Sequence, residues 1–348
     1  MSAPWPPINL DFLRIMTDST GILQHARFSV PRYEEGYCLD DNARALLLMS
    51  RLERAGPPPD LAGLASRYLA FVSHAFNAPL GRFRNFMDFS RRWLEHLGSE
   101  DSHGRALWAL GATVAGTRDP GRRALAEELF RAALPAARAF TWPRPWAYAL
   151  LGAHAYLAAV PGDAAAAALE QDLAGRLHAL YRARAGPSWR WFEDRLTYAN
   201  ARLPQALILA GGRSRRPDWA AAGLEALDWL ARVQTDPYGR FLPVGCAGFY
   251  VRGGVRADYD QQPVEACATV SGCLDALAAT GDPVWAGRAR DAFQWFLGRN
   301  TLGLPLYDPR TGGCRDGLRP DGANQNLGAE STLSFLLALQ DLREKLEA

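Results

Sequence analysis

Two adjacent aspartates, Asp40 and Asp41, are the residues of this sequence best suited to acid–base chemistry. They precede Asn42 and an apolar run, so both acids fall at the start of a predicted helix, where unpaired N–H groups favour negative charge. Two carboxyls that share a small volume repel each other, which separates their pKa values. Such a separation suits one proton donor and one base or nucleophile. Capping of the helix by one of the two acids is the alternative interpretation.

Further polar residues mark the starts of other apolar segments. Asp and Asn at such positions commonly cap helices, but together they exceed what capping requires. A carboxylate inside an apolar helix needs a partner or a use, and Glu265 and Glu330 are of this kind. Two histidines could bind hydroxyls, donate a proton or only hold loops. The candidate binding residues are His25, Arg44, Asp101, His103, Trp191, Glu193, Asp194, Asn200, Asp260, Gln262, Glu265, Gln325, Asn326 and Glu330.

The elements that must position these residues are helices of two alternating kinds. One kind is apolar nearly all round and must be enclosed, over residues 43–50, 105–115, 147–159, 201–210, 264–279 and 327–339. The other kind is amphipathic, over residues 61–76, 122–139, 164–182, 218–233 and 284–297, with a further segment at 8–17. Six repeats of one inner and one outer helix predict an all-α (α/α)6 barrel, a six-hairpin toroid formed by residues 1–348 as one domain.

Loop lengths predict where the site lies in such a barrel. The loops that enter the inner helices are long, at residues 82–102, 187–199, 238–261 and 304–325, with short hairpins among them. The loops that leave the inner helices are short. Long loops in a compact domain are commonly functional. We therefore expect the site on the rim where the inner helices begin.

The same loops are rich in aromatic residues, among them Phe86, Trp93, Trp191 and Tyr198. Carboxylates and amides can bind sugar hydroxyls, while flat rings can stack on the C–H faces of a sugar. Cleavage of a glycosidic bond needs two carboxyl groups, one as acid and one as nucleophile or base. The combination predicts a carbohydrate substrate, with Asp40 and Asp41 as the catalytic pair. Pinning of the long loops is the alternative role for the aromatic residues.

Composition excludes several other classes of function. The formal net charge is +2, from 39 basic and 37 acidic residues, which argues against a nucleic-acid or membrane-surface partner. Lys345 is the only lysine and lies in a tail that we expect to be solvated, so Schiff-base chemistry has no lysine to use. Five scattered cysteines and six histidines show no zinc-binding spacing. We expect no metal and no cofactor, and a cytoplasmic monomer or weak homodimer.

The segment Tyr37-Cys38-Leu39-Asp40-Asp41-Asn42-Ala43 resembles the Tyr-x-Asp-Asp-Asn-Ala signature of glycoside hydrolase family 76. A second segment, Tyr198-Ala199-Asn200-Ala201-Arg202, is similar to a later Asn-Ala segment of that family. The resemblance implies an (α/α)6 fold and an endo-acting α-1,6-mannanase activity. It also implies that Asp40 and Asp41 act as nucleophile and acid/base.

The main functional hypothesis is therefore a glycoside hydrolase, with an α-mannoside as one candidate substrate. Two alternatives remain open, because one fold can carry several chemistries. One is a sugar epimerase or isomerase of the N-acyl-glucosamine 2-epimerase type, which favours paired histidines, for which His25 and His103 are the candidates. The other is a non-catalytic glycan-binding domain that accompanies a glycosyltransferase.

Overall fold

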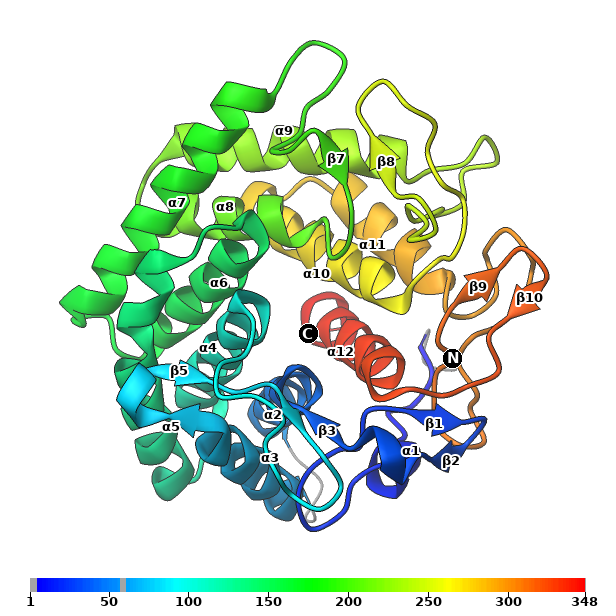
Figure 1. The fold of residues 1–348 in the computed structure, drawn as a ribbon. Coiled ribbons are helices and arrows are strands. Elements are labelled where there is room, and N and C mark those ends of the chain that lie inside the picture. The colour runs from blue at the N-terminus through cyan, green and yellow to red at the C-terminus, as the bar shows by residue number, and fades with distance from the viewer. Residues whose placement is uncertain (1–4, 57–60, 348) are drawn as a thin grey trace. The chain divides into compact units, whose positions relative to one another are not determined.

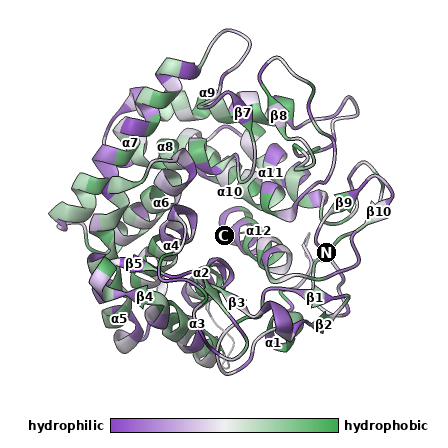
Figure 2. Cartoon of the chain, viewed as in Figure 1, coloured by the Kyte–Doolittle hydropathy of each residue, from purple (hydrophilic) through white to green (hydrophobic). Residues whose placement is uncertain are grey.

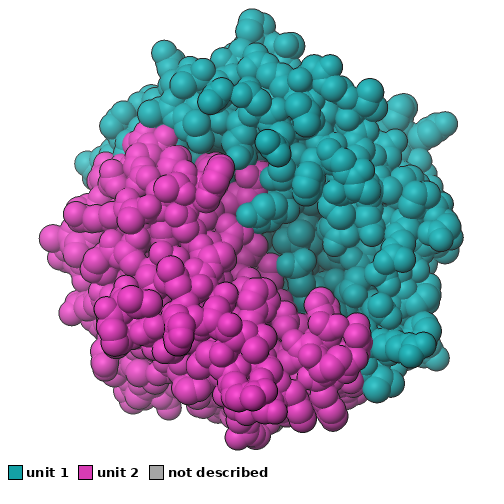
Figure 3. All heavy atoms as spheres, in the orientation of Figure 1, with its two compact units in different colours: residues 1–13, 26–30, 177–348 teal, residues 14–25, 31–176 magenta. Residues whose placement is uncertain are grey.

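The computed structural model describes residues 5–56 and 61–347, which are mainly helical (Figure 1). The chain divides into two compact units, coloured separately in Figure 3. We call residues 14–25 and 31–176 the N-terminal unit. We call the described parts of residues 1–13, 26–30 and 177–348 the C-terminal unit. The unit boundaries fall within α1 (Asp11–Ile15), α7 (Ala164–Arg184) and the pair of β1 (Ala26–Arg27) with β2 (Val30–Pro31).

The N-terminal unit alternates inner helices with outer helices. Its α-helices are α2 (Leu39–Ala55), α3 (Leu61–Ala75), α4 (Glu100–Gly116), α5 (Pro120–Ala133) and α6 (Pro143–Ala159). The 3₁₀ segment Leu134–Ala139 extends α5. Short strands connect these helices: β3 (Tyr37–Cys38) pairs with β6 (Phe86–Met87), and β4 (Phe76–Asn77) pairs with β5 (Arg82–Phe83). Helix α4 packs against α2 on one side and α6 on the other, while α3 and α5 cover α2 and α4.

Small residues let the three inner helices of this unit approach closely. A Cβ atom on Gly111 of α4 would lie 2.2 Å from the carbonyl oxygen of Gly152 on α6. On α2, Ser50 shares a 2.9 Å hydroxyl hydrogen bond with Thr113 of α4. Near the N-termini of α4 and α6, a Cβ atom on Gly104 would lie 3.0 Å from the Pro145 carbonyl oxygen. Helices α2, α4 and α6 therefore run parallel, and their N-termini lie at one end of the unit.

The C-terminal unit repeats this arrangement. Its helices are α8 (Arg202–Arg213), α9 (Pro217–Val233), α10 (Pro263–Thr280), α11 (Val284–Gln294) and α12 (Ala329–Leu346). Strand β7 (Arg195–Leu196) pairs with β8 (Tyr250–Val251), and β9 (Leu318–Arg319) pairs with β10 (Gly322–Ala323). Helix α10 lies between α8 and α12, while α9 covers α8 and α11 covers α10.

Buried hydrogen bonds cross the inner helices of the C-terminal unit. Ser271 of α10 donates to Asp341 of α12 at 2.6 Å, and Gln205 of α8 donates to Asp275 of α10 at 2.6 Å. Lys345 forms an ion pair with Asp275. Lys345 is exposed, as expected of a solvated tail, although the tail is helical because α12 continues to Leu346.

The predicted alternation of helices agrees with the structure, and the differences lie at helix ends. Outer helix α7 buries Ala166, Leu169, Leu173 and Leu177 at helical spacing, and it carries both hydrophilic and hydrophobic residues (Figure 2). The segment predicted over 8–17 forms only the five residues of α1, since the backbone turns at Thr17 and bridges to Ile22. Helices α2, α4 and α6 begin four or five residues earlier than their predicted apolar runs, and polar residues occupy the first turns of α2 and α4. Helices α8 and α12 begin one and two residues later than predicted.

Candidate active site

The predicted acidic pair lies in the first turn of α2. Backbone pairing of β3 with β6 leads into the helix, and Cys38 caps its N-terminus by accepting the backbone N–H of Asp41 on its sulfur at 3.4 Å. The exposed N–H groups of a first turn favour carboxylates. The two side chains leave the helix in different directions and find different partners.

Asp41 is buried and is held at both carboxylate oxygens. Its Oδ1 accepts from Arg44 Nη1 at 2.9 Å, three residues along the same helix. Its Oδ2 accepts from the thiol of Cys38 at 3.1 Å. Side-chain exposure is 7% for Asp41 and 9% for Arg44, so water screens this ion pair weakly.

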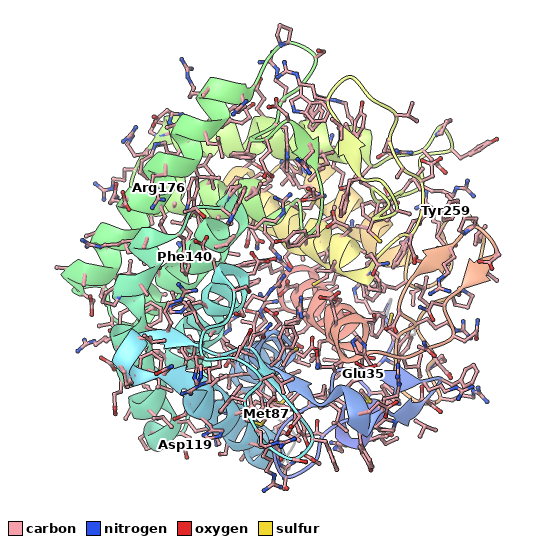
Figure 4. The ribbon with its side chains drawn as sticks, viewed as in Figure 1. Glu35, Met87, Asp119, Phe140, Arg176 and Tyr259 are labelled. Carbon is pink, nitrogen blue, oxygen red and sulfur yellow. The ribbon has the colours of Figure 1, made fainter. Side chains whose placement is uncertain are left out.

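Asp40 is more accessible and is held by other elements. Asn85, which directly precedes β6 (marked by Met87 in Figure 4), donates from Nδ2 to Asp40 Oδ2 at 3.1 Å. The Nε of Arg105 on α4 lies 3.2 Å from Asp40 Oδ1. Burial raises the pKa of the Asp40 carboxyl, while the positive charges of Arg105 and Arg44 oppose that rise. Asp40 therefore keeps its proton to a higher pH than an ordinary aspartic acid.

Arg105 connects Asp40 to two buried aromatic rings. Its guanidinium lies 4.1 Å from the ring centroid of Tyr148 on α6, in cation–π geometry. Tyr148 in turn stacks with Trp108 of α4, with ring centroids 6.2 Å apart. Asp101, one turn before Arg105, lies 3.9 Å from its Nη2. The N-termini of α2 and α4 thus bring together Asp40, Asp41, Arg44 and Asp101 from the predicted set.

The two histidines of the predicted set lie in different environments. His103 is completely buried on α4, between the rings of Phe83 and Phe140, and its Nε2 lies 3.0 Å from the Ala133 carbonyl oxygen. Burial lowers the pKa of His103 to about 3. His25 is exposed, and its carbonyl accepts the N–H of Arg32 at 2.9 Å. Since helix positions 101 and 105 face Asp40, His103 points to the opposite side of α4.

In the C-terminal unit, Glu265 has the partners that a buried carboxylate requires. The Glu265 carboxylate accepts from Asn200 Nδ2 at 2.8 Å and from the Asn200 backbone N–H at 3.3 Å. It also accepts from Gln234 Nε2 at 3.3 Å. Asn200 also closes its own turn, with Oδ1 accepting from the Thr197 N–H at 3.0 Å. The structure thus joins two predicted residues, Asn200 and Glu265, in one buried network.

Asp260 and Gln262 lie together before α10. A Cβ on Gly317 would meet Asp260 Oδ1 at 3.0 Å and Gln262 Nε2 at 3.2 Å, so both side chains border this glycine. Burial raises the pKa of the Asp260 carboxyl, and Arg319, 3.6 Å away, opposes that rise. Asp260 is the second carboxyl among the candidates whose pKa is raised in this way.

The remaining candidates lie in loops of the C-terminal unit or, for Glu330, in helix α12. Trp191 is buried against Phe192 and Trp229, and the Glu193 carbonyl accepts from Trp189 Nε1 at 2.8 Å. Asp194 is exposed and pairs with Arg184 at 2.8 Å. Asn326 Oδ1 accepts the N–H of Phe28 at 2.9 Å, and Gln325 donates to the Ala323 carbonyl. Glu330 is half-buried in the first turn of α12.

Three residues at the acidic pair were missed as site residues by the sequence analysis: Cys38, Asn85 and Arg105. Arg105 follows Asp101 by four residues, which is the spacing of neighbours on one helix face and could have indicated it. Asn85 comes from a long loop, and only the pairing of β3 with β6 brings it to α2. Nothing in the local sequence indicates that contact.

Two general properties of the described chain bear on the site. Across residues 5–56 and 61–347, His, Cys, Asp and Glu side chains do not gather in threes that could hold a metal ion. Over the same residues, every helix is too short or too polar to cross a bilayer.

Comparison with known proteins identifies the fold. No protein-family model matches the sequence, and neither does any curated protein. Among solved structures, a sugar epimerase from a ruminal bacterium matches with a TM-score of 0.76 and 12% identity, covering 97% of each chain. Cellobiose 2-epimerase from Bacillus thermoamylovorans B4167 matches with a TM-score of 0.74 and 11% identity, covering 95% of each. A GH76 α-mannanase from Bacteroides thetaiotaomicron matches with a TM-score of 0.65 and 9% identity, covering 97% of this chain and 95% of that one.

These similarities confirm the all-α, six-hairpin (α/α)6 fold predicted from the sequence. The similar structures are enzymes named for activity on carbohydrates, and they include both epimerases and a glycoside hydrolase. At this level of identity the likeness concerns the fold alone.

Proposed function

We propose that this chain is a glycoside hydrolase that acts on an oligosaccharide through Asp40 and Asp41, with α-mannosides as the first substrate class to test. The observation that carries the proposal is the unequal environment of two adjacent carboxyls. Asp40 has a raised pKa and is held by Asn85 and Arg105, whereas Asp41 is paired with Arg44. One acid that keeps its proton beside one carboxylate is the combination that glycosidic cleavage uses.

In the proposed reaction, protonated Asp40 gives its proton to the glycosidic oxygen as the bond from that oxygen to the anomeric carbon breaks. The Asp41 carboxylate then either attacks the anomeric carbon or takes a proton from a water molecule that does so. In the first case water later releases the sugar and returns the proton to Asp40. The two routes give opposite anomers of the product, so an anomer assay separates them.

The second candidate, a sugar epimerase or isomerase, is favoured by the epimerases among the similar structures. Proton transfer beside a carbonyl would favour a pair of histidines at the site. His103 packs between two phenylalanine rings with a pKa of about 3, and His25 is exposed on a loop. Among the described residues, no hydrogen bond or ion pair joins either histidine to Asp40 or Asp41. For this reason we place the hydrolase first.

The test is a screen of α-mannosides and other oligosaccharides with detection of product anomers, on the wild type, Asp40→Asn and Asp41→Asn. We expect hydrolysis by the wild type and loss of about 100-fold or more in kcat for each variant. Asp172→Asn is the matched control, because Asp172 is 49% exposed and pairs with Arg176 on the surface of α7. Epimerised sugar without hydrolysis would support the second candidate. Glycan binding without turnover of any kind would support a non-catalytic domain.

A further inference from the structure

Cys38 is an unusual residue for its position. It is the N-cap of α2, where Ser, Thr, Asp and Asn predominate because their oxygens accept hydrogen bonds well. Its sulfur accepts the Asp41 N–H at 3.4 Å, which is a weaker cap than a hydroxyl would supply. The same sulfur also lies 3.1 Å from Asp41 Oδ2, with the S–H donating. Cys38 thus contacts both the backbone and the side chain of Asp41.

The thiol keeps the proton that this second contact needs. Cys38 is buried, and burial together with the charges of Asp41 and Asp40 raises the pKa of the thiol well above its usual value. A neutral thiol can donate to a carboxylate, whereas a thiolate beside two acids would repel them.

The arrangement leaves Asp41 little freedom to rotate. Arg44 binds Oδ1 at 2.9 Å and Cys38 binds Oδ2 at 3.1 Å, so the plane of the carboxylate is fixed from both sides. Asp40 is the other charged group that acts on Cys38, and Asp40 in turn faces Arg105, Arg44 and Asp101. These residues are the same in every Cys38 variant, so the variants differ from one another only at position 38.

We infer that Cys38 is a positioning residue that orients Asp41 and, through a weak S–H hydrogen bond, sets how readily its carboxylate accepts a proton or attacks carbon. This inference rests on the proposed hydrolase function. A weak donor holds the carboxylate in place while withdrawing little of its electron density. A hydroxyl at the same position would hold it as firmly but would stabilise the ionised form more.

The test compares Cys38→Ser with Cys38→Ala in the pH dependence of kcat/KM. Because Asp41 acts in its ionised form, activity rises with pH as Asp41 loses its proton. Serine donates more strongly, favours the carboxylate and moves this acidic limb to lower pH. Alanine removes the donor and moves the limb to higher pH, by about one pH unit or less. We also expect alanine to lower kcat by roughly 10- to 100-fold with little change in KM.

A merely structural role for Cys38 would not produce limbs displaced in opposite directions. Cys273→Ser and Cys273→Ala are the matched controls, since Cys273 is fully buried on α10 of the C-terminal unit, where the charge that acts on it is that of Arg288. They should change stability in a comparable way and leave the limb in place. The inference is overturned if both Cys38 variants keep the limb of the wild type or displace it in the same direction.

A second readout does not depend on activity. The S–H stretching band of Cys38, isolated as the infrared difference between wild type and Cys38→Ala, should lie at the frequency of a hydrogen-bonded thiol. It should move toward the frequency of a free thiol in Asp41→Leu. An unchanged band in that variant would refute the contact itself. Turnover that is absent from the wild type would instead refute the proposed function, whatever the band shows.

Discussion

Replacing Arg105 by methionine should make the stability of the protein depend more strongly on pH through Asp40. The guanidinium Nε lies 3.2 Å from Asp40 Oδ1, and both side chains are largely buried, at 9% and 23% exposure. At an effective dielectric of about 20, two unit charges at this separation attract by about 5 kcal/mol. Removal of one partner from a buried ion pair typically costs about 3–5 kcal/mol.

Asp40 can escape much of that penalty by binding a proton, which makes the loss depend on pH. Burial already raises the pKa of Asp40, and the loss of Arg105 raises it further. The folded state then binds a proton that the unfolded state has released, so stability falls as pH rises from the ordinary aspartate value toward the raised one. The slope is at most about 1.4 kcal/mol per pH unit. We expect a loss of about 3 kcal/mol at pH 8 and a clearly smaller loss at pH 5.

Urea unfolding between pH 5 and pH 8 measures this effect for Arg105→Met, Asp40→Asn and the double variant. In the Asp40→Asn background, replacement of Arg105 should lower the free energy of unfolding by less, and by the same amount at every pH. The difference between the two backgrounds is the coupling energy of Asp40 and Arg105. Arg123→Met, at an exposed position on α5, is the control. The reasoning would be refuted if Arg105→Met lost the same stability at every pH, or the same stability with Asp and with Asn at position 40. Either result would mean that the ion pair with Arg105 does not set the pKa of Asp40.

Three further predictions concern packing and buried polar groups. Gly111→Ala should destabilise the protein by about 1–3 kcal/mol in urea unfolding, because the new Cβ would lie 2.2 Å from the Gly152 carbonyl oxygen. Gly287→Ala on α11 is the control, and it should be neutral or slightly stabilising because its Cβ would meet open space. The pKa of His103 is about 3 in the folded protein, below the value of about 6.5 for an unfolded chain. The free energy of unfolding should therefore fall as pH drops below about 6.5, by up to about 2 kcal/mol at pH 5. In urea unfolding, His103→Gln should abolish this part of the pH dependence. Glu265→Gln should cost about 1–3 kcal/mol of stability, since three N–H donors converge on this carboxylate, and an unchanged urea midpoint would contradict that account.

The helices were predictable from the sequence because each has a local cause. Apolar residues at helical spacing, small residues where helices cross, and the turn residues between them are all local in the chain. The N-terminus of α4 also has a local cause, because Ser99 is its N-cap and accepts the Ser102 N–H at 3.0 Å. The predicted segment at 8–17 shortened to α1 because a turn and a bridge between Thr17 and Ile22 compete with the helix, and that pairing depends on residues beyond the window.

The acidic pair was predictable as a motif, but the partners of each acid were not. Arg44 is three residues from Asp41 on one helix and could be paired with it by spacing alone. Asn85 and Arg105 lie 45 and 65 positions from Asp40, and they reach it only because β6 pairs with β3 and α4 packs parallel to α2. Contacts of this kind are set by tertiary structure, which sequence periodicity does not contain.

The geometry of a helix explains why two consecutive aspartates can perform two different tasks. Neighbouring residues on an α-helix point about 100° apart, since 3.6 residues complete a turn. From one backbone turn, Asp40 is therefore directed to Asn85 and Arg105, while Asp41 is directed back to its own helix, at Cys38 and Arg44. Each carboxyl is contacted by a separate set of side chains, although the charge of Arg44 also lowers the pKa of Asp40. Mutation of Asn85 or Arg105 can therefore alter the protonation of Asp40 while the contacts of Asp41 stay intact. An exchange of either aspartate for glutamate should then be tolerated poorly, because one added methylene moves the carboxyl past partners that are fixed by the backbone of β6, α2 and α4.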